Sequence, residues 1–144
     1  MESLKNLILK FRETSSRVIV VKVSPDSSEE EVLKVCEILL NFFKTVINIG
    51  NSKYVKADSV GLSSKTFSKE GGGLSGKSLY SNTLKTVKLI SSKYDLPIIA
   101  TGGVSSYDNV KELLDNGASL TGMATLLVSD PFQIPLINYR LSND

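Results

Sequence analysis

Residues 70–79, with the sequence Glu-Gly-Gly-Gly-Leu-Ser-Gly-Lys-Ser-Leu, are compatible with two different α/β folds. The P-loop pattern of nucleotide hydrolases is satisfied by Gly71, Gly76, Lys77 and Ser78. A working P-loop follows a buried apolar strand and has a helix N-terminus directly behind it. The segment before Gly71 is polar and doubly basic, and no apolar strand ending in Asp is available to hold magnesium. P-loop nucleotide binding is therefore the less favoured interpretation.

Patterns on either side of this stretch predict alternating helices and strands. A short amphipathic helix is expected at 2–12, and four strand–helix units follow it. The expected strands cover 18–23, 46–49, 97–100 and 119–125. The expected helices cover 27–43, 82–93, 107–116 and 131–139, the last made less regular by Pro135. Alternation of this kind predicts a parallel α/β sheet.

Local signals mark where several of these elements begin and end. Ser27 and Glu30 have the spacing of a capping box at the start of the helix at 27–43. Gly117 is expected to end the helix before it as a left-handed residue. The β-branched run at 18–23 has the composition of a buried strand.

Residues 51–80 form the longest stretch without a helix or strand period, and they are rich in Ser, Lys and Gly. A loop of this length inside a compact domain usually has a functional reason. We therefore interpret this segment as a functional loop.

The composition is that of an ordinary globular chain. Its 144 residues are 41% hydrophobic and 22% charged, which suits one domain with a core. The net charge of +2 comes with scattered lysines, so nucleic-acid binding has no support. No apolar run is long enough to span a bilayer, and no signal or transit peptide is visible at 1–12.

The chain has no histidine and a single cysteine, Cys36. Disulfide frameworks, zinc sites and histidine-dependent triads are therefore excluded. Cys36 lies in the apolar stripe of the helix expected at 27–43, so we interpret it as a small core residue. The remaining chemistry is that of Lys, Ser, Asn, carboxylates or a bound cofactor.

Four blocks of the sequence together resemble one enzyme family. Gly72-Gly-Leu-Ser-Gly-Lys77, Leu96-Pro-Ile-Ile-Ala-Thr-Gly-Gly-Val104 and Asn116-Gly-Ala-Ser-Leu120 follow one another, and Val20-Val-Lys-Val-Ser-Pro-Asp26 precedes them. Their order and spacing resemble the C-terminal half of dihydroorotate dehydrogenases, most closely the membrane-associated class that uses quinone. The resemblance spans about residues 2–141, nearly the whole chain.

The resemblance implies half of a (β/α)₈ TIM barrel. A complete barrel has about 250 residues, whereas this chain has room for four parallel strand–helix units. The matched blocks are those of the last four strands of the family's barrel. Residues 1–144 are therefore expected to form a single domain, a partial TIM barrel that lacks the N-terminal half.

By the same resemblance, the expected activity is FMN-dependent oxidation of dihydroorotate to orotate in pyrimidine synthesis, with quinone as electron acceptor. The family implies a place at the mitochondrial inner membrane or the bacterial membrane periphery, although the chain itself has a soluble composition. The segment that carries the family's catalytic base has no counterpart here, and Ser24 and Ser63 are interpreted as loop serines. No catalytic residue is therefore assigned.

Two ways of completing the barrel follow from this interpretation. The chain would form a homodimer, or it would associate with a separately encoded N-terminal half. The alternative function is that of a non-catalytic half barrel that binds FMN, a phosphate or a protein partner.

The resemblance also assigns a phosphate site. Gly102, Gly103 and the backbone near Ala124 and Thr125 would hold the FMN phosphate, since glycine lets backbone N–H groups approach it closely. In a full barrel these residues would follow strands seven and eight, where phosphate is commonly bound. The other interpretation of the two glycines is an ordinary strand-to-helix turn.

Four further residues are expected around the flavin and the substrate. Lys22 would lie against the flavin ring, the other interpretation being a lysine that extends from a strand end into solvent. Ser75 and Gly76 would contact the flavin from the Gly-Gly-Leu-Ser-Gly-Lys segment. Asn51 would bind the substrate, although the threonines that flank it in the family are altered here.

Overall fold

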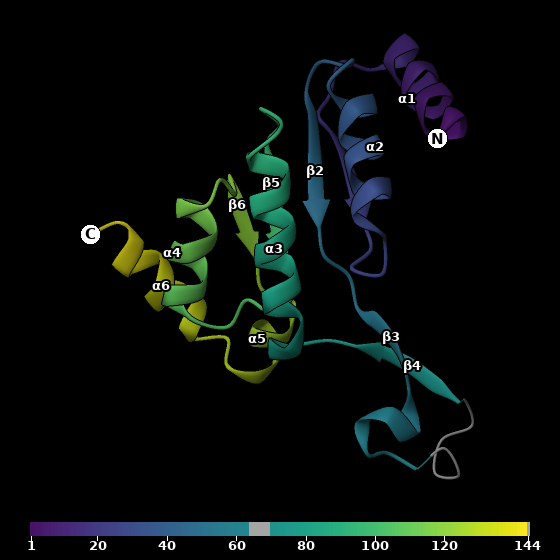
Figure 1. The fold of residues 1–144 in the computed structure, drawn as a ribbon. Helices are drawn as coiled ribbons and strands as arrows, with labels where there is room; N and C mark the ends of the chain where they lie inside the picture. Colours follow the sequence, from purple (N-terminus) through teal and green to yellow (C-terminus); the bar gives the residue numbers. More distant parts are fainter. Residues whose placement is uncertain (64–69, 144) are drawn as a thin grey trace.

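A computed structural model describes residues 1–63 and 70–143 (Figure 1). Its centre is a four-stranded parallel sheet with the strand order β1-β2-β5-β6. The strands are β1 (Ile19–Val23), β2 (Thr45–Ile49), β5 (Ile98–Thr101) and β6 (Leu120–Gly122). The α/β fold with parallel strand–helix units is therefore confirmed.

Three helices lie side by side along one face of this sheet (Figure 1). They are α2 (Glu29–Leu39), α3 (Tyr80–Ser91) and α4 (Tyr107–Asp115). Apolar side chains on one stripe of each helix meet apolar side chains from one face of the strands. The resulting core includes Leu39, Ile47, Ile90, Ile98 and Leu113, all fully buried. Cys36 belongs to the same core, as predicted.

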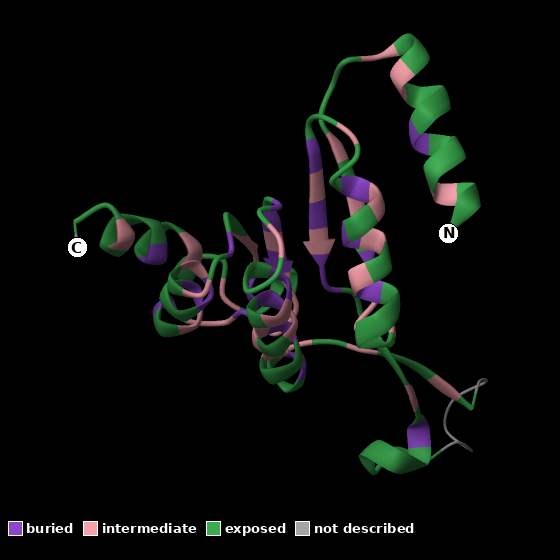
Figure 2. Cartoon of the chain, turned by 45° about the horizontal axis from the view of Figure 1, so that its top comes forward, coloured by how far each residue is buried: buried purple, intermediate pink, exposed green. Residues whose placement is uncertain are grey.

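The opposite face of the sheet is half-buried along its two central strands and exposed in places along its edge strands. Buried and half-buried residues alternate along β2 (Figure 2), so each strand presents its two faces to different surroundings. Val18 and Val20 are 56% and 48% exposed, and Leu120 on the other edge strand is 61% exposed. The prediction of a buried strand at 18–23 is therefore wrong, because the described residues cover only one face of β1.

Between β2 and α3 the chain forms an antiparallel hairpin that projects from the sheet (Figure 1). β3 (Lys53–Lys56) is followed by the 3₁₀ helix η1 (Ala57–Val60), and β4 (Gly71–Leu74) by η2 (Lys77–Leu79). The N–H of Tyr54 donates to Asp26 Oδ2 at 3.1 Å and ties the hairpin to the β1–α2 turn. Most of the described residues between 51 and 80 are thus in strands or helices and not in an irregular loop as expected, and residues 64–69 lie outside the described part.

Several element boundaries differ from the prediction. α2 ends at Leu39, whose carbonyl accepts from the Thr45 hydroxyl at 2.9 Å, and does not continue to residue 43. The strand predicted at 119–125 ends at Gly122, and a short helix, α5 (Ala124–Ser129), begins there. α6 (Gln133–Leu141) begins late enough that Pro135 lies in its first turn, where a backbone N–H has no partner within the helix. Pro135 therefore does not disturb the helix.

The N-terminal helix α1 (Glu2–Thr14) is attached to the body at one end of the sheet. Ile8 is its one buried residue, whereas Leu7 and Phe11 are 66% and 42% exposed. The Arg12 guanidinium holds the helix to the α2–β2 turn by donating to the carbonyl oxygens of Phe43 and Lys44 at 2.5 and 3.2 Å. The hydrogen bonds of Arg12 therefore add to the limited burial of α1.

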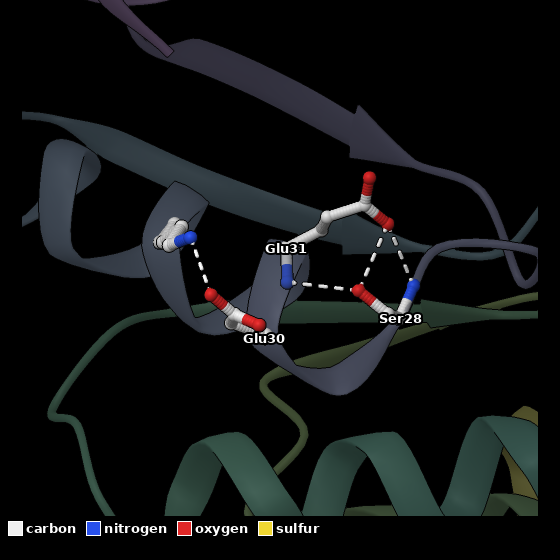
Figure 3. A network of polar contacts seen from close by, with 4 residues as sticks. Ser28, Glu30 and Glu31 are labelled. Carbon is white, nitrogen blue, oxygen red and sulfur yellow. Dashed lines mark hydrogen bonds and ion pairs between the residues drawn. The ribbon is translucent and has the colours of Figure 1, made fainter.

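The start of α2 has a capping box formed by Ser28 and Glu31 (Figure 3). Ser28 Oγ accepts from the Glu31 N–H at 3.2 Å, and the Glu31 carboxylate accepts from the Ser28 N–H at 2.8 Å. Donation to the Glu31 carboxylate by the Ser28 N–H, and by the Ser28 hydroxyl at 3.0 Å, lowers the pKa of Glu31. The prediction of Ser27 and Glu30 is wrong by one residue, because the Ser27 N–H donates to Ser24 O in the preceding turn and Ser28 becomes the extended N-cap.

Replacing Ser28 with alanine is expected to lower the free energy of unfolding by about 1 kcal/mol, because the Glu31 N–H loses its acceptor. Ser27→Ala is the matched control and is expected to change it by less than about 0.5 kcal/mol. Urea titrations followed by circular dichroism measure both. Equal losses in the two variants would contradict the assignment of Ser28 as the cap.

Candidate functional site

The carboxyl ends of the parallel strands, together with the end of the hairpin, surround a hollow of about 500 Å³. This volume is within the range of about 300–1,000 Å³ that small-molecule sites occupy. The residues singled out from the sequence lie far apart along the chain, yet all of them line this hollow. They are Lys22, Asn51, Ser75, Gly76, Gly102, Gly103, Ala124 and Thr125.

The turn between β5 and α4 depends on two glycines. Gly102 has a φ of +130° and Gly103 a φ of +76°, conformations that other residues rarely adopt. A Cβ on Gly103 would overlap the backbone nitrogen of Tyr80 and would lie 3.0 Å from Gly76 O. Glycine at this position therefore allows the first turn of α3 and the end of the hairpin to approach the β5–α4 turn.

Gly76 and Thr125 are neighbours in the wall of the hollow. Gly76 has a φ of +93°, and a Cβ on it would lie 3.6 Å from Thr125 Cγ2. Thr125 and Ala124 are in the first turn of α5, not in a strand as expected. The end of the hairpin and the start of α5 therefore lie next to each other here.

The hollow carries a positive charge. Lys22 is the only charged residue among the described residues that line it. Its neighbour in the sheet is Asn48, whose Oδ1 lies 2.7 Å from Thr101 Oγ1. One cation, several hydroxyl groups and side-chain-free glycine backbone suit an anionic ligand with polar edges.

Several residues of the hollow were not predicted from the sequence. They are Ser52, Leu79, Thr101, Val104, Gly122 and Met123. Thr101 and Gly122 are the last residues of β5 and β6. Because active sites of barrel folds lie at the carboxyl ends of the strands, this position could have indicated from the sequence that they line the site. Leu79 and Met123 have apolar side chains without such a signal, and only the fold brings them to the hollow.

The two loop serines lie elsewhere. Ser24 Oγ accepts from the Asp26 N–H at 3.2 Å, and Ser24 lines a separate, smaller hollow beside Asn82. Ser63 is not among the described residues that line the hollow at the strand ends. Neither serine is therefore in position to act on a ligand bound there.

The geometry of residues 71–78 disagrees with a P-loop. Gly71 to Leu74 are extended and pair with β3 in an antiparallel ladder, so they do not wrap around a phosphate. The strand that precedes the turn belongs to the hairpin and not to the central parallel sheet. The glycines of this segment therefore serve the hairpin and the wall of the hollow.

Tyr80 links α3 to α4 next to the Gly102–Gly103 turn. Its hydroxyl donates to Glu112 Oε2 at 2.6 Å. Burial, together with this carboxylate, raises the pKa of Tyr80 to about 12. Tyr80 therefore ties the first turn of α3 to α4, and its phenol is protonated at neutral pH.

Cys36 is expected to be unreactive in the folded chain. Its side chain is 0% exposed, and burial raises the pKa of the thiol to about 11. At pH 8 a disulfide reagent is expected to modify it about 100-fold more slowly than in the urea-unfolded chain, since both the thiolate fraction and access are low. The released chromophore, followed with time, gives both rates. Equal rates would contradict the buried position of Cys36.

A model of the dihydroorotate dehydrogenase family matches residues 1–143. The chain belongs to the dihydroorotate dehydrogenase family. The quinone-type dihydroorotate dehydrogenase of Vibrio cholerae is 32% identical over 104 residues, which cover 71% of this chain and 30% of that protein. The mitochondrial quinone-type enzyme of Schizosaccharomyces pombe is 31% identical over 129 residues, covering 88% of this chain and 28% of that protein.

A solved structure also resembles the chain. The dihydroorotate dehydrogenase of Eimeria tenella, crystallised with ferulenol, superposes with a TM-score of 0.73 at 25% identity. It matches 88% of this chain and 34% of its own length. The chain thus spans about a third of the length of the dihydroorotate dehydrogenases that it matches.

Two kinds of feature are absent from residues 1–63 and 70–143. No helix there has both the length and the apolar character needed to cross a bilayer. No group of three or more cysteine or carboxylate side chains is placed to hold a metal ion.

Proposed function

We propose that this chain forms the FMN-binding part of a dihydroorotate dehydrogenase, which oxidises dihydroorotate to orotate and passes the electrons to quinone. The single observation that supports this most directly is the convergence on one hollow of eight residues from five separate segments of the chain. Family membership implies a flavin cofactor in general, and the names of the relatives specify quinone. FMN, dihydroorotate and quinone are therefore the proposed ligands.

The residues around the hollow fit a flavin that carries a phosphate. The Gly102–Gly103 turn presents backbone without side chains, so N–H groups can approach a phosphate closely. Lys22 adds a positive charge, and none of the described residues that line the hollow is acidic. A dianionic phosphate would therefore meet attraction and no like charge. The phosphate would be held by this turn and by the start of α5 at Ala124 and Thr125.

Bound FMN would accept a hydride from dihydroorotate. Lys22, beside the flavin ring, would favour the negative charge that develops there on reduction. Ser75 and Gly76 would contact the flavin from the hairpin side, and Asn51 would hydrogen-bond the substrate from the end of β2. The reaction also requires a base for the neighbouring proton, and none of these residues is proposed as that base.

The four parallel strands would be the last four of a (β/α)₈ barrel. The exposed face with Val20 and Leu120 would line the barrel interior, and the free edges of β1 and β6 would pair with further strands. These strands would come from the same polypeptide, from a separately encoded half or from a second copy. Reaction with quinone would take place at a bacterial membrane or at the mitochondrial inner membrane, since relatives of both kinds are known.

The test is co-elution of flavin with the protein. The purified chain is incubated with FMN and passed over a gel-filtration column, and the visible absorbance of the protein peak is compared with its peptide absorbance. One flavin per chain is expected, or one per two chains if a dimer completes the site. A colourless protein peak would contradict the proposal, and a coloured one would be assayed with dihydroorotate and a quinone.

A further inference from the structure

Thr83 is a buried polar residue whose hydroxyl contacts the Gly102–Gly103 turn between β5 and α4. It lies in the first half of α3 and is 2% exposed. Its hydroxyl lies 2.9 Å from the carbonyl oxygen of Gly102 and 3.2 Å from that of Leu79. The contact with Leu79 is the local bond that helical threonines often form with the residue four positions earlier. The shorter contact with Gly102 links α3 to a segment that is distant in the sequence.

The approach between Thr83 and the turn is close. A Cβ on Gly102 would lie 2.6 Å from Thr83 Oγ1, so a larger residue at position 102 would displace the hydroxyl. Gly102 also has a φ of +130°, which an L side chain rarely adopts. The Thr83 hydroxyl can therefore keep its position only if residue 102 is glycine.

The hydrogen bond from Thr83 fixes the direction of a peptide group. The carbonyl of Gly102 and the N–H of Gly103 belong to one planar trans peptide, so they point in opposite directions. When the carbonyl accepts from Thr83, the N–H of Gly103 is directed away from α3. Gly102 and Gly103 both line the hollow, which places this peptide group at the ligand.

We propose that Thr83 is a positioning residue that orients the Gly102–Gly103 peptide so that the Gly103 N–H donates to the phosphate of the bound flavin. This rests on the proposed binding of FMN. Thr83 itself would not touch the ligand, since its hydroxyl is occupied by carbonyl oxygens of the chain. Its effect would therefore be confined to the phosphate end of the cofactor.

The test compares FMN with riboflavin, which has the same ring system without the phosphate. Dissociation constants for both are measured by flavin fluorescence titration with the wild-type chain, Thr83→Val and Thr83→Ser. Thr83→Val keeps the branched shape but has no hydroxyl. It is expected to weaken FMN binding about tenfold, the size of one misdirected backbone hydrogen bond, and to change riboflavin binding less than about twofold. Thr83→Ser keeps the hydroxyl and is expected to restore FMN binding.

Other outcomes would overturn the inference in distinguishable ways. An equal loss for FMN and riboflavin in Thr83→Val would show a general structural role, and unchanged FMN binding would show no role. A wild-type chain that binds neither flavin would overturn the proposed function and this inference with it. If Thr83→Val does not fold, Thr83→Ala, which removes the hydroxyl without adding bulk, is titrated in its place against the same expectations.

Discussion

Alanine in place of Gly50 is expected to lower the free energy of unfolding by at least about 4 kcal/mol, an exceptional loss for one substitution. Gly50 follows β2 and has a φ of +133°, which side chains other than glycine rarely tolerate. A Cβ there would overlap the backbone carbonyl of Thr101 and lie 2.5 Å from Thr101 Oγ1. A backbone group at the end of β5 has no rotamer to change, so the overlap is relieved only by separating β2 from β5.

Gly72→Ala is the matched control for Gly50→Ala. No atom lies within 4 Å of a Cβ at Gly72, and its φ is outside the left-handed range. Its free energy of unfolding is expected to stay within about 0.5 kcal/mol of the wild-type value. Urea unfolding followed by circular dichroism measures both variants. The free energy of unfolding of a small domain is about 5–15 kcal/mol in total. The yield of soluble Gly50→Ala should therefore fall as well. A wild-type unfolding midpoint for Gly50→Ala would contradict the close packing of β2 on β5.

Strands were predictable where their side chains carry the signal. β1, β2 and β5 coincide with the apolar and β-branched runs predicted at 18–23, 46–49 and 97–100. β4 was not predictable in this way, since three of its four residues are glycines, which have low strand propensity. Its extended shape comes from backbone pairing with β3, a contact between distant segments that no local period encodes.

The choice between neighbouring residues also depends on contacts that the sequence does not display. Ser27 and Ser28 both have a glutamate three residues later. Only the turn that begins at Ser24 decides that Ser28 is the N-cap. Local patterns therefore predicted the presence of the cap, and tertiary geometry decided its position.

The candidate site was predictable in outline, but only through the family resemblance. Glycines and a single lysine do not identify a ligand by their own chemistry, so composition and spacing alone left the phosphate site open. The structure adds that the eight residues share one hollow. Thr83 was not predictable, because a threonine inside an amphipathic helix carries no sign of a hydrogen bond to a distant carbonyl. Supporting residues of this kind become visible only when the fold is known.

Reversing the charge at Lys22 with glutamate is expected to weaken FMN binding at least about 100-fold. A hydrogen bond from a charged group is worth about 1.5–3 kcal/mol, and each 1.4 kcal/mol is about tenfold in affinity. Repulsion between the new carboxylate and the anionic cofactor adds to this loss. Lys22 is the only charged residue among those described around the hollow, so no neighbouring cation replaces it. Titration of FMN fluorescence in about 0.1 M salt measures the change.

Two further variants separate a local effect of Lys22 from a change in net charge. Lys10→Glu lowers the formal charge from +2 to 0, as Lys22→Glu does, but Lys10 is exposed on α1. It is expected to leave the dissociation constant within about twofold, since exposed charges beyond a Debye length of about 10 Å are screened in 0.1 M salt. Lys22→Gln removes the charge without reversing it and should cost about tenfold. If Lys22→Glu binds FMN as tightly as the wild type, the flavin does not lie against β1, and the face of the sheet that carries Lys22 serves another purpose than binding the cofactor.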